Sequence, residues 1–119
     1  MKLENNLYDK AFSFSIMVIK EYKAIVKNKK EYILSKQFLR SGTSIGANIA
    51  EANGAISKAD FSSKISIAYK ESLETKYWIL LMKETALIPG ERSEQLWATA
   101  DELSKIMFAI LKTTRINKP

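Results

Sequence analysis

The chain has 119 residues, enough for one hydrophobic core and short for two, so we expect a single domain over residues 1–119. It contains neither cysteine nor histidine, which excludes disulfides, thiolate nucleophiles, sulfur-ligated metals and the commonest general base. The 19 Lys and Arg residues outnumber the 13 Asp and Glu residues, and the net charge of +6 is compatible with a polyanionic partner without demonstrating one.

The hydropathy pattern predicts neither a membrane span nor a secretory signal. No apolar run approaches the ~20 residues that a spanning helix needs, since Lys76 and Lys83 flank even the apolar stretch 77–82 closely. The N-terminal residues reach Asp9 without a long apolar region. We therefore expect a cytoplasmic protein with no membrane partner.

The first predicted helix covers residues 7–26, where apolar residues recur every three or four positions and so share one helix face. This stripe comprises Leu7, Ala11, Phe14, Val18, Tyr22 and Ile25. Three lysines and an asparagine follow at 27–30, and cations suit the negative end of a helix dipole. We expect the helix to end there in a polar turn.

The second predicted helix covers residues 31–53 and combines an apolar stripe with a run of small residues. The stripe comprises Phe38, Gly42, Ile45, Ile49, Ala52 and Ile56. Gly42, Gly46 and Ala50 recur at every fourth position. Glycine inside a helix costs about 1 kcal/mol relative to alanine, so close packing against another helix is the favoured reason for this run. A glycine hinge is disfavoured because the periodicity continues through Gly42.

The third and fourth predicted helices are separated by Pro89 and Gly90. Ser57 and Asp60 form a pattern typical of a helix start, with an acid three residues after the capping hydroxyl. The third helix then carries a heptad-like stripe of Phe61, Ile65, Ala68, Ser72, Thr75, Ile79, Met82 and Ala86. The fourth carries Leu96, Ala100, Leu103, Met107, Ile110 and Thr114.

Four long helices joined by short loops predict an all-α fold, an antiparallel up-down-up-down four-helix bundle.

Two helices carry more apolar residues than one core requires. The additional residues are Tyr8, Phe12, Ile19 and Val26 in the first helix, and Tyr69, Leu73, Tyr77, Leu80 and Leu87 in the third. We favour a symmetric homo-oligomer that buries them, the alternative being a compact monomer with broad helix faces.

Four polar residues share one face of the second helix, on the flank of its core stripe: Arg40, Ser44, Asn48 and Glu51. One interpretation is a ligand or subunit contact. The favoured interpretation is a structural hydrogen-bonded network, or a solvated face, because buried polar groups usually serve structure.

No catalytic pattern emerges. A carboxylate metal cluster could be formed by Glu71 and Glu74 with Glu51 or Glu102. Di-iron bundles need Glu-x-x-His, however, and without histidine only an all-oxygen Mg or Mn site would remain. Pairing of Glu71 and Glu74 with lysines is the favoured interpretation. Residues 42–46 lack the Gly-Lys-Ser/Thr ending of a phosphate loop. We expect no enzyme, cofactor or metal.

Residues 27–40 form the candidate nucleic-acid interface, because Glu31 is the one acid among five cations: Lys27, Lys29, Lys30, Lys36 and Arg40. Lys83 and Arg92 are expected at the same bundle end, and a second basic group comprises Lys112, Arg115 and Lys118. The alternative is an ordinary solvated surface, since no interleaving of basic and aromatic residues accompanies these cations.

Three segments carry a family resemblance: LSKQFLRSGTSIGANIAEA at 34–52, SKADF at 57–61 and AYKESLETKYW at 68–78. They resemble the bacterial four-helix-bundle family named for reading frames within intervening sequences of 23S rRNA genes. The resemblance implies a left-handed antiparallel bundle without enzyme activity. By analogy with related accessory proteins of diversity-generating retroelements, it also implies a homopentameric barrel with a basic surface that contacts nucleic acid.

The leading hypothesis is a non-enzymatic oligomer, most simply a pentamer, that binds RNA or a nucleoprotein partner through phosphate contacts. The second is a protein-protein scaffold whose charge serves solubility. The third, a magnesium-dependent enzyme using Glu51, Glu71 and Glu74, is the least favoured.

Overall fold

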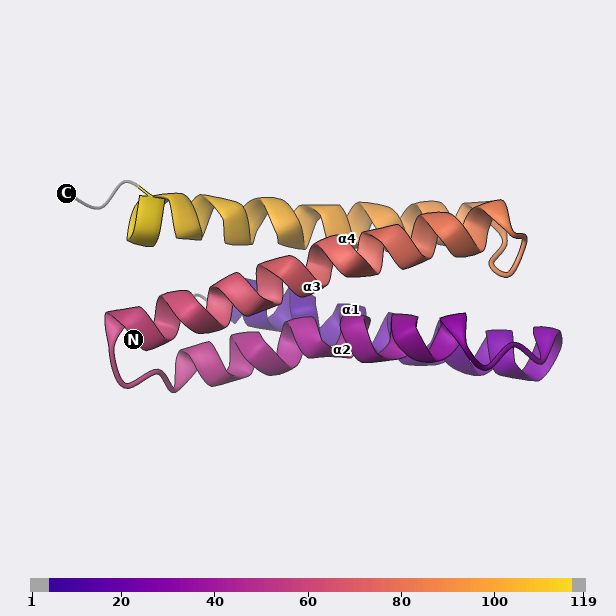
Figure 1. The fold of residues 1–119 in the computed structure, drawn as a ribbon, viewed down its shortest axis with the longest axis horizontal. Coiled ribbons are helices and arrows are strands. Elements are labelled where there is room, and N and C mark those ends of the chain that lie inside the picture. The colour runs from indigo at the N-terminus through magenta and orange to yellow at the C-terminus, as the bar shows by residue number, and fades with distance from the viewer. Residues whose placement is uncertain (1–4, 117–119) are drawn as a thin grey trace.

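The computed structural model describes residues 5–116, and every regular element in that range is helical. The four α-helices are α1 (Asn5–Lys29), α2 (Leu34–Asn53), α3 (Lys58–Glu84) and α4 (Gly90–Leu111), followed by a π-helical turn, η1 (Lys112–Ile116). Successive helices run antiparallel along a molecule measuring 49 × 22 × 22 Å (Figure 1). The predicted all-α, up-down-up-down bundle is confirmed.

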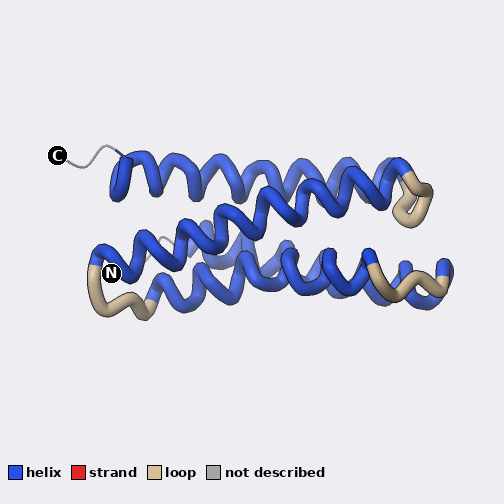
Figure 2. Tube along the Cα trace, viewed as in Figure 1, coloured by secondary structure: helices blue, strands red, loops and turns tan. Residues whose placement is uncertain are grey.

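The four helices stand in a square. α1 packs against α2 and α4, and α3 packs against the same two helices, so α1 and α3 occupy one diagonal. The α1–α2 and α3–α4 connections lie at one end of the bundle, and the α2–α3 connection lies at the other (Figure 2). The outward faces of α1 and α3 consequently point away from each other.

The predicted stripes supply the core, and the capping pattern before α3 is confirmed. Phe14, Phe38 and Ile65 are completely buried. The Ser57 hydroxyl accepts a hydrogen bond from the Asp60 amide at 2.9 Å, and the Asp60 carboxylate accepts one at 3.3 Å from the amide preceding Ser57. The first bond satisfies a backbone donor that the first helical turn leaves without a partner, and the second holds the chain just before the helix.

Two pairs of buried hydroxyls connect neighbouring helices inside the core. Ser41 of α2 and Thr75 of α3 lie 3.0 Å apart, and Ser72 of α3 and Ser104 of α4 lie 2.7 Å apart. A buried hydroxyl is costly without a hydrogen-bond partner, so each pair favours one axial register of its two helices.

Several predicted core positions were wrong, two of them at helix ends. Ile56 is 93% exposed because α2 ends at Asn53 and the chain leaves the core before it. Ala86 is exposed because α3 ends at Glu84 and the chain reverses with a φ of 62° at Ala86, so Ile88 takes the buried position. In α1, the buried position next to Tyr22 belongs to Glu21, and Tyr22 is only half-buried.

The run of small residues on α2 has three different environments. A Cβ on Gly42 would lie 2.8 Å from a methyl group of Val18, so the α1 and α2 backbones approach closely there. At Gly46 the nearest atom would be the Ser15 Oγ at 3.2 Å. Ala50 is exposed, so close packing concerns the two glycines and not the whole run.

Candidate functional site

Four lysines form an exposed group at the α1–α2 end of the bundle: Lys27, Lys29, Lys30 and Lys36, called the lysine cluster below. None of them forms an ion pair with another residue that the structure describes. No described residue neutralises their charges through an ion pair, which is the condition that favours contact with a polyanion.

Glu31, the acid inside this basic stretch, is turned towards the backbone of α2. Its carboxylate accepts hydrogen bonds from the amides of Ile33, Leu34 and Ser35 at 3.0, 2.9 and 2.8 Å. Burial raises the pKa of Glu31, but these hydrogen bonds outweigh it and hold the pKa below its usual value of 4.5. Helix α2 thus begins at Leu34 rather than at Glu31, which caps it.

The α3–α4 connection brings a further lysine to the same end of the bundle. Lys29 and Lys83 both line an open pocket of about 440 Å³, together with Glu84 and residues of the α3–α4 turn. Lys83 therefore shares a bundle end with the lysine cluster, as predicted, since it lines the same pocket as Lys29. Glu84 offsets part of the added positive charge.

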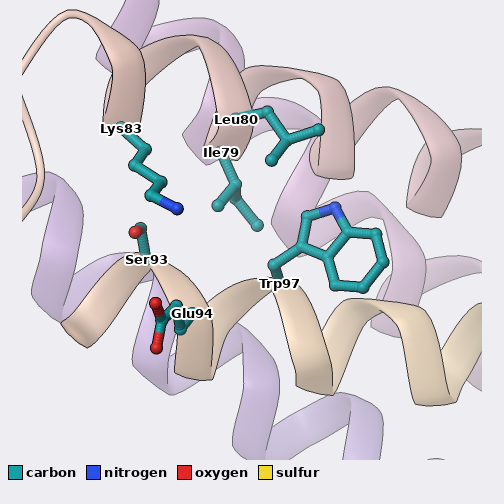
Figure 3. A pocket seen from close by; sticks show the side chains of 6 residues that line it. All are labelled: Ile79, Leu80, Lys83, Ser93, Glu94 and Trp97. Atoms are coloured by element: carbon teal, nitrogen blue, oxygen red, sulfur yellow. The ribbon is translucent and has the colours of Figure 1, made fainter. Parts of the chain in front are cut away.

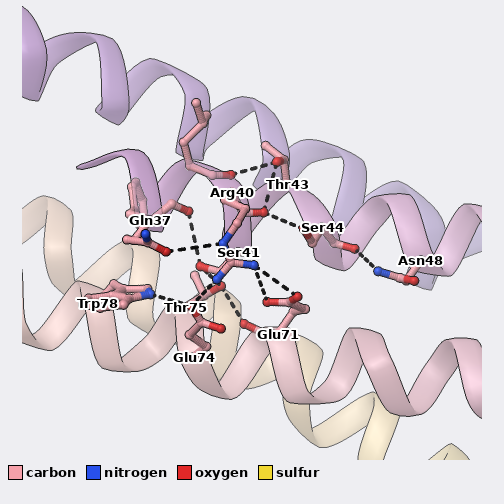
Figure 4. A network of polar contacts seen from close by, with 12 residues as sticks. Gln37, Arg40, Ser41, Thr43, Ser44, Asn48, Glu71, Glu74, Thr75 and Trp78 are labelled. Carbon is pink, nitrogen blue, oxygen red and sulfur yellow. Dashed lines mark hydrogen bonds and ion pairs between the residues drawn. The ribbon is translucent and has the colours of Figure 1, made fainter. Parts of the chain in front are cut away.

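Arg40 has a different environment from the lysines, since it lies between two carboxylates of α3. Its Nη1 is 3.3 Å from both carboxylate oxygens of Glu71, and its Nη2 donates to Glu74 (Figure 4). The Trp78 indole also donates to Glu74, at 2.9 Å. The hydrogen bond to Glu74 raises the pKa of Arg40, and the Trp78 hydrogen bond is the largest cause of the lowered pKa of Glu74. Arg40 thus bridges α2 and α3.

The other members of the polar α2 face do not form a continuous side-chain network with Arg40. The Ser44 hydroxyl donates to the Arg40 carbonyl at 2.6 Å, and the Asn48 amide donates to the Ser44 carbonyl at 2.9 Å. Glu51 pairs across to Lys64 of α3 at 2.8 Å. These contacts are bonds to the backbone or bridges between helices, which fits the structural interpretation of this face.

The interface between α1 and α4 contains an ion pair that the sequence pattern did not indicate. The Glu21 side chain is only 6% exposed, and Arg92 donates to its two oxygens at 2.7 and 3.0 Å. Arg92 was predicted beside the lysine cluster as a cation, but half of its side chain is covered and its charge is matched by Glu21. Lys10 and Glu102 form a second ion pair between the same helices.

The remaining charged groups suggested by the sequence are dispersed. Lys112 is exposed in η1, whereas the side chain of Arg115 and the whole of Lys118 lie outside the described part of the chain.

Among the residues that the structure describes, no three potential metal ligands gather in one place. No helix between residues 5 and 116 has the length and apolar character that crossing a membrane requires.

Two exposed apolar faces lie on opposite sides of the bundle. The α1 face is formed by Phe12, Ile16 and Ile19, whose exposed fractions are 55, 42 and 39%. The α3 face is formed by Leu73, Tyr77 and Leu80, with exposed fractions of 41, 59 and 47%. Most of the additional apolar residues noted in the sequence therefore remain exposed in one copy of the chain.

The α3 face continues into a pocket of about 360 Å³ between α3 and α4 (Figure 3). Its lining residues are Ile79, Leu80, Lys83, Ser93, Glu94 and Trp97. The Trp97 indole nitrogen is buried, and it has no hydrogen-bond partner among the described residues. Lys76 lies over the Trp97 ring, 5.1 Å from its centre, and pairs with Asp101 at 2.9 Å.

Comparisons with known proteins found a family and a close structural match. The family model for 23S rRNA-intervening sequence proteins matches residues 3–109. A crystal structure from Bacteroides thetaiotaomicron VPI-5482, of a protein with unknown function from the S23 ribosomal protein family, is 44% identical with a TM-score of 0.87. The match covers 89% of this chain and 98% of the other. The search of curated proteins found no match.

Proposed function

Since the chain belongs to the 23S rRNA-intervening sequence protein family, we propose that it is a non-enzymatic, oligomeric helical bundle that binds RNA, free or within a nucleoprotein, through the lysine cluster. The observation that carries this proposal is the group of four exposed lysines without ion pairs. Glu31, the one acid within residues 27–40, is engaged by backbone amides and competes little for them. Phosphate groups are the anions that such a surface attracts.

The two apolar faces support the oligomeric part of the proposal. They belong to different helices on opposite sides of the bundle, so a symmetric dimer through one face would leave the other face of each copy exposed. Contact between the α1 face of one copy and the α3 face of the next is a head-to-tail arrangement, and such contacts close into rings when the rotation permits.

The faces also lie at similar heights along the bundle axis. The ion pairs of Lys10 and Lys76 reach consecutive residues of α4, so these two lysines share a level. Because α1 and α3 run in the same direction, Phe12 and Tyr77 lie within about one helical turn of each other. A neighbouring copy can then dock without an axial shift, so repeated contacts need not climb into a helical filament. They close into a ring when each copy is also turned relative to the last, and the ring of five that the family resemblance implies is our proposal for its size.

A ring of this kind would place every lysine cluster at the same end of the assembly. Each copy would supply only a few phosphate contacts, but linked sites bind a common ligand with a combined affinity far above that of one site. The expected ligand is therefore a polyanion long enough to reach several copies.

The test compares two charge-matched variants in binding a structured RNA. Replacing Lys29 and Lys30 by Gln removes two charges from the lysine cluster, and replacing Lys58 and Lys112 by Gln removes two exposed charges at the opposite end. We expect the first variant to weaken binding and to reduce the slope of log affinity against log salt by about 1 to 2 for each copy that the RNA contacts. The second should bind like the parent.

Equal losses in both variants would show that total charge, and not the lysine cluster, determines binding. A parent protein that binds no RNA at low salt would reject the RNA proposal and favour the alternative, a protein-protein scaffold. For that alternative the exposed α1 and α3 faces are the supporting observation. A packed apolar interface would respond little to salt.

A further inference from the structure

The α1–α2 connection presents an aromatic ring within the lysine cluster. Lys30 adopts a left-handed conformation with φ of 54°, and Glu31 then turns inward to cap α2. The Ser35 hydroxyl donates to the Glu31 carbonyl at 2.7 Å, which ties the same turn to the helix. As a result Tyr32 and Ile33 point outward, with exposed fractions of 55 and 76%.

Neither the core nor the two apolar faces accounts for Tyr32. Tyr8, Tyr69 and Tyr77 each contact another aromatic ring, whereas Tyr32 has no such contact with any described residue. Tyr32 also lies at the end of the bundle, beyond the helix sides that form the α1 and α3 faces. The four lysines precede and follow it within a few residues of the chain, so this end of the bundle offers an exposed aromatic ring in the same connection as the lysine cluster.

We propose that Tyr32 stacks on an unpaired base while the lysine cluster contacts the phosphates on either side of it. This inference rests on the proposed RNA binding and specifies the ligand as single-stranded RNA or an unpaired loop. Aromatic stacking surfaces combined with a basic surface are the usual means of binding single strands, because every base has a face that can stack. The bases of a duplex are already stacked on one another and cannot reach Tyr32 without being opened.

The turn is suited to this role because it is held in place before any ligand arrives. Three hydrogen bonds to the Glu31 carboxylate and one from the Ser35 hydroxyl define the backbone on both sides of Tyr32. A surface that is ordered in advance loses less conformational entropy on binding. The sequence-based statement that no aromatic residue is interleaved with these cations is therefore wrong at Tyr32, which lies between Lys30 and Lys36 and is exposed. The sequence pattern concealed this arrangement, since a helix starting at Glu31 would have placed Tyr32 within its first turn.

The experiment measures the affinity of the full chain for a mixed-sequence RNA of about 12 nucleotides, a length typical of single-strand sites, and for the duplex of the same length. Tyr32→Leu removes the ring and keeps an apolar side chain. Loss of one stacked base should weaken single-strand binding about five- to hundredfold. Duplex binding and the salt slope should stay unchanged, because no phosphate contact is lost.

Two variants serve as controls. Tyr32→Phe keeps the ring and should retain the single-strand affinity of the parent. Lys29→Gln should weaken binding of both RNAs and reduce the salt slope, which Tyr32→Leu does not. Circular dichroism should show the same helical content for all variants, since Tyr32 lies outside the helices and more than half of it is exposed.

The outcomes separate this inference from the proposed function. If Tyr32→Leu binds the single strand as tightly as the parent, or loses the duplex equally, Tyr32 is not a stacking surface although RNA binding through the lysines stands. If the parent binds neither RNA at low salt, the proposed function fails and the stacking inference fails with it.

Discussion

At the scale of single residues, Glu31 links the stability of α2 to the charge of the lysine cluster. Its carboxylate satisfies three backbone amides that the first turn of α2 would otherwise leave without partners. The same bonds hold a negative charge close to the helix N-terminus, where the helix dipole is positive. The residue that looks like a counter-charge to the lysines is therefore mainly a helix cap.

Replacing Glu31 by Gln should lower the free energy of unfolding at neutral pH by about 1 kcal/mol, the usual value of a helix cap. The measurement is urea denaturation monitored by circular dichroism. Glu94→Gln is the matched control, since Glu94 is exposed and forms no ion pair with a described residue. Equal stability of the two variants would contradict the capping role.

The same pair of proteins should show a defined pH dependence. Because the folded pKa of Glu31 lies below its unfolded value, its contribution is complete above the unfolded pKa and disappears as the pH falls through the folded pKa. The difference in stability between the parent and Glu31→Gln should therefore shrink on acidification. A difference that stays constant down to strongly acidic pH would mean that the carboxylate charge is not involved.

Two glycines of α2 should respond in opposite ways to the same substitution. Gly42→Ala would place a methyl group 2.8 Å from Val18, and such overpacking costs about 1 to 3 kcal/mol. Gly46→Ala meets the Ser15 hydroxyl oxygen at 3.2 Å, which can move slightly, and the Ala11 carbonyl at an ordinary contact distance of 3.5 Å; it gains about 1 kcal/mol of helix propensity. Thermal melting should rank Gly42→Ala below the parent and Gly46→Ala at or above it; the reverse order would refute the packing argument.

At the scale of helices, the interface between α1 and α4 depends on charge. Glu21 is buried there with Arg92 as its partner, and Lys10 pairs with Glu102 nearer the other end. These two helices are the first and last of the bundle, so no short loop holds them together. By contrast, α2 and α3 are joined by a loop, by paired core hydroxyls and by Arg40.

The two partners of the buried ion pair should have unequal effects when removed. Arg92→Met leaves the Glu21 carboxylate buried without a partner and should cost about 1 to 3 kcal/mol. Glu21→Met leaves only an arginine that is half exposed and adds an apolar side chain to the interface, so stability should stay within about 1 kcal/mol of the parent. Urea denaturation checks both variants, and equal costs would mean that the interface does not bury the carboxylate.

At the scale of the whole molecule, the opposed apolar faces predict how copies assemble. Phe12→Asp places a charge on the α1 face and leaves the α3 face intact, whereas Tyr77→Asp does the reverse. In a head-to-tail ring each variant alone should fail to assemble, because every contact needs both faces. Mixed in equal amounts, they should form a species of two chains of 13.5 kDa each.

Light scattering after size exclusion measures these masses, with circular dichroism confirming that both variants fold. Dimers of Phe12→Asp alone would indicate a symmetric contact between two α3 faces and would reject the ring. A parent protein that is monomeric at micromolar concentration would reject the oligomer altogether.

The sequence by itself determined the number of helices, their order and most of the core. An apolar period of three to four residues gives each helix one apolar face, and helices joined by short loops bury those faces by packing antiparallel. The start of α3 was equally readable, since Ser57 and Asp60 act within a single turn. The basic character of the α1–α2 stretch followed directly from composition. Most errors lay at helix ends, where Glu31, Ile56 and Ala86 were assigned to helices that stop before reaching them or start after them. Tyr22 and Ala50 lie within helices, and their exposure depends on the neighbouring helices.

Only the tertiary structure decided which charged side chains form ion pairs and which do not. Arg40 and the lysines look alike in sequence, yet Arg40 meets Glu71 and Glu74 because packing of α2 on α3 brings together residues 31 and 34 positions apart. The burial of Glu21 against Arg92 depends likewise on partners 71 positions apart. Helical periodicity describes one element at a time, whereas ion pairing and exposure depend on distances between elements, and those distances exist only in the folded bundle.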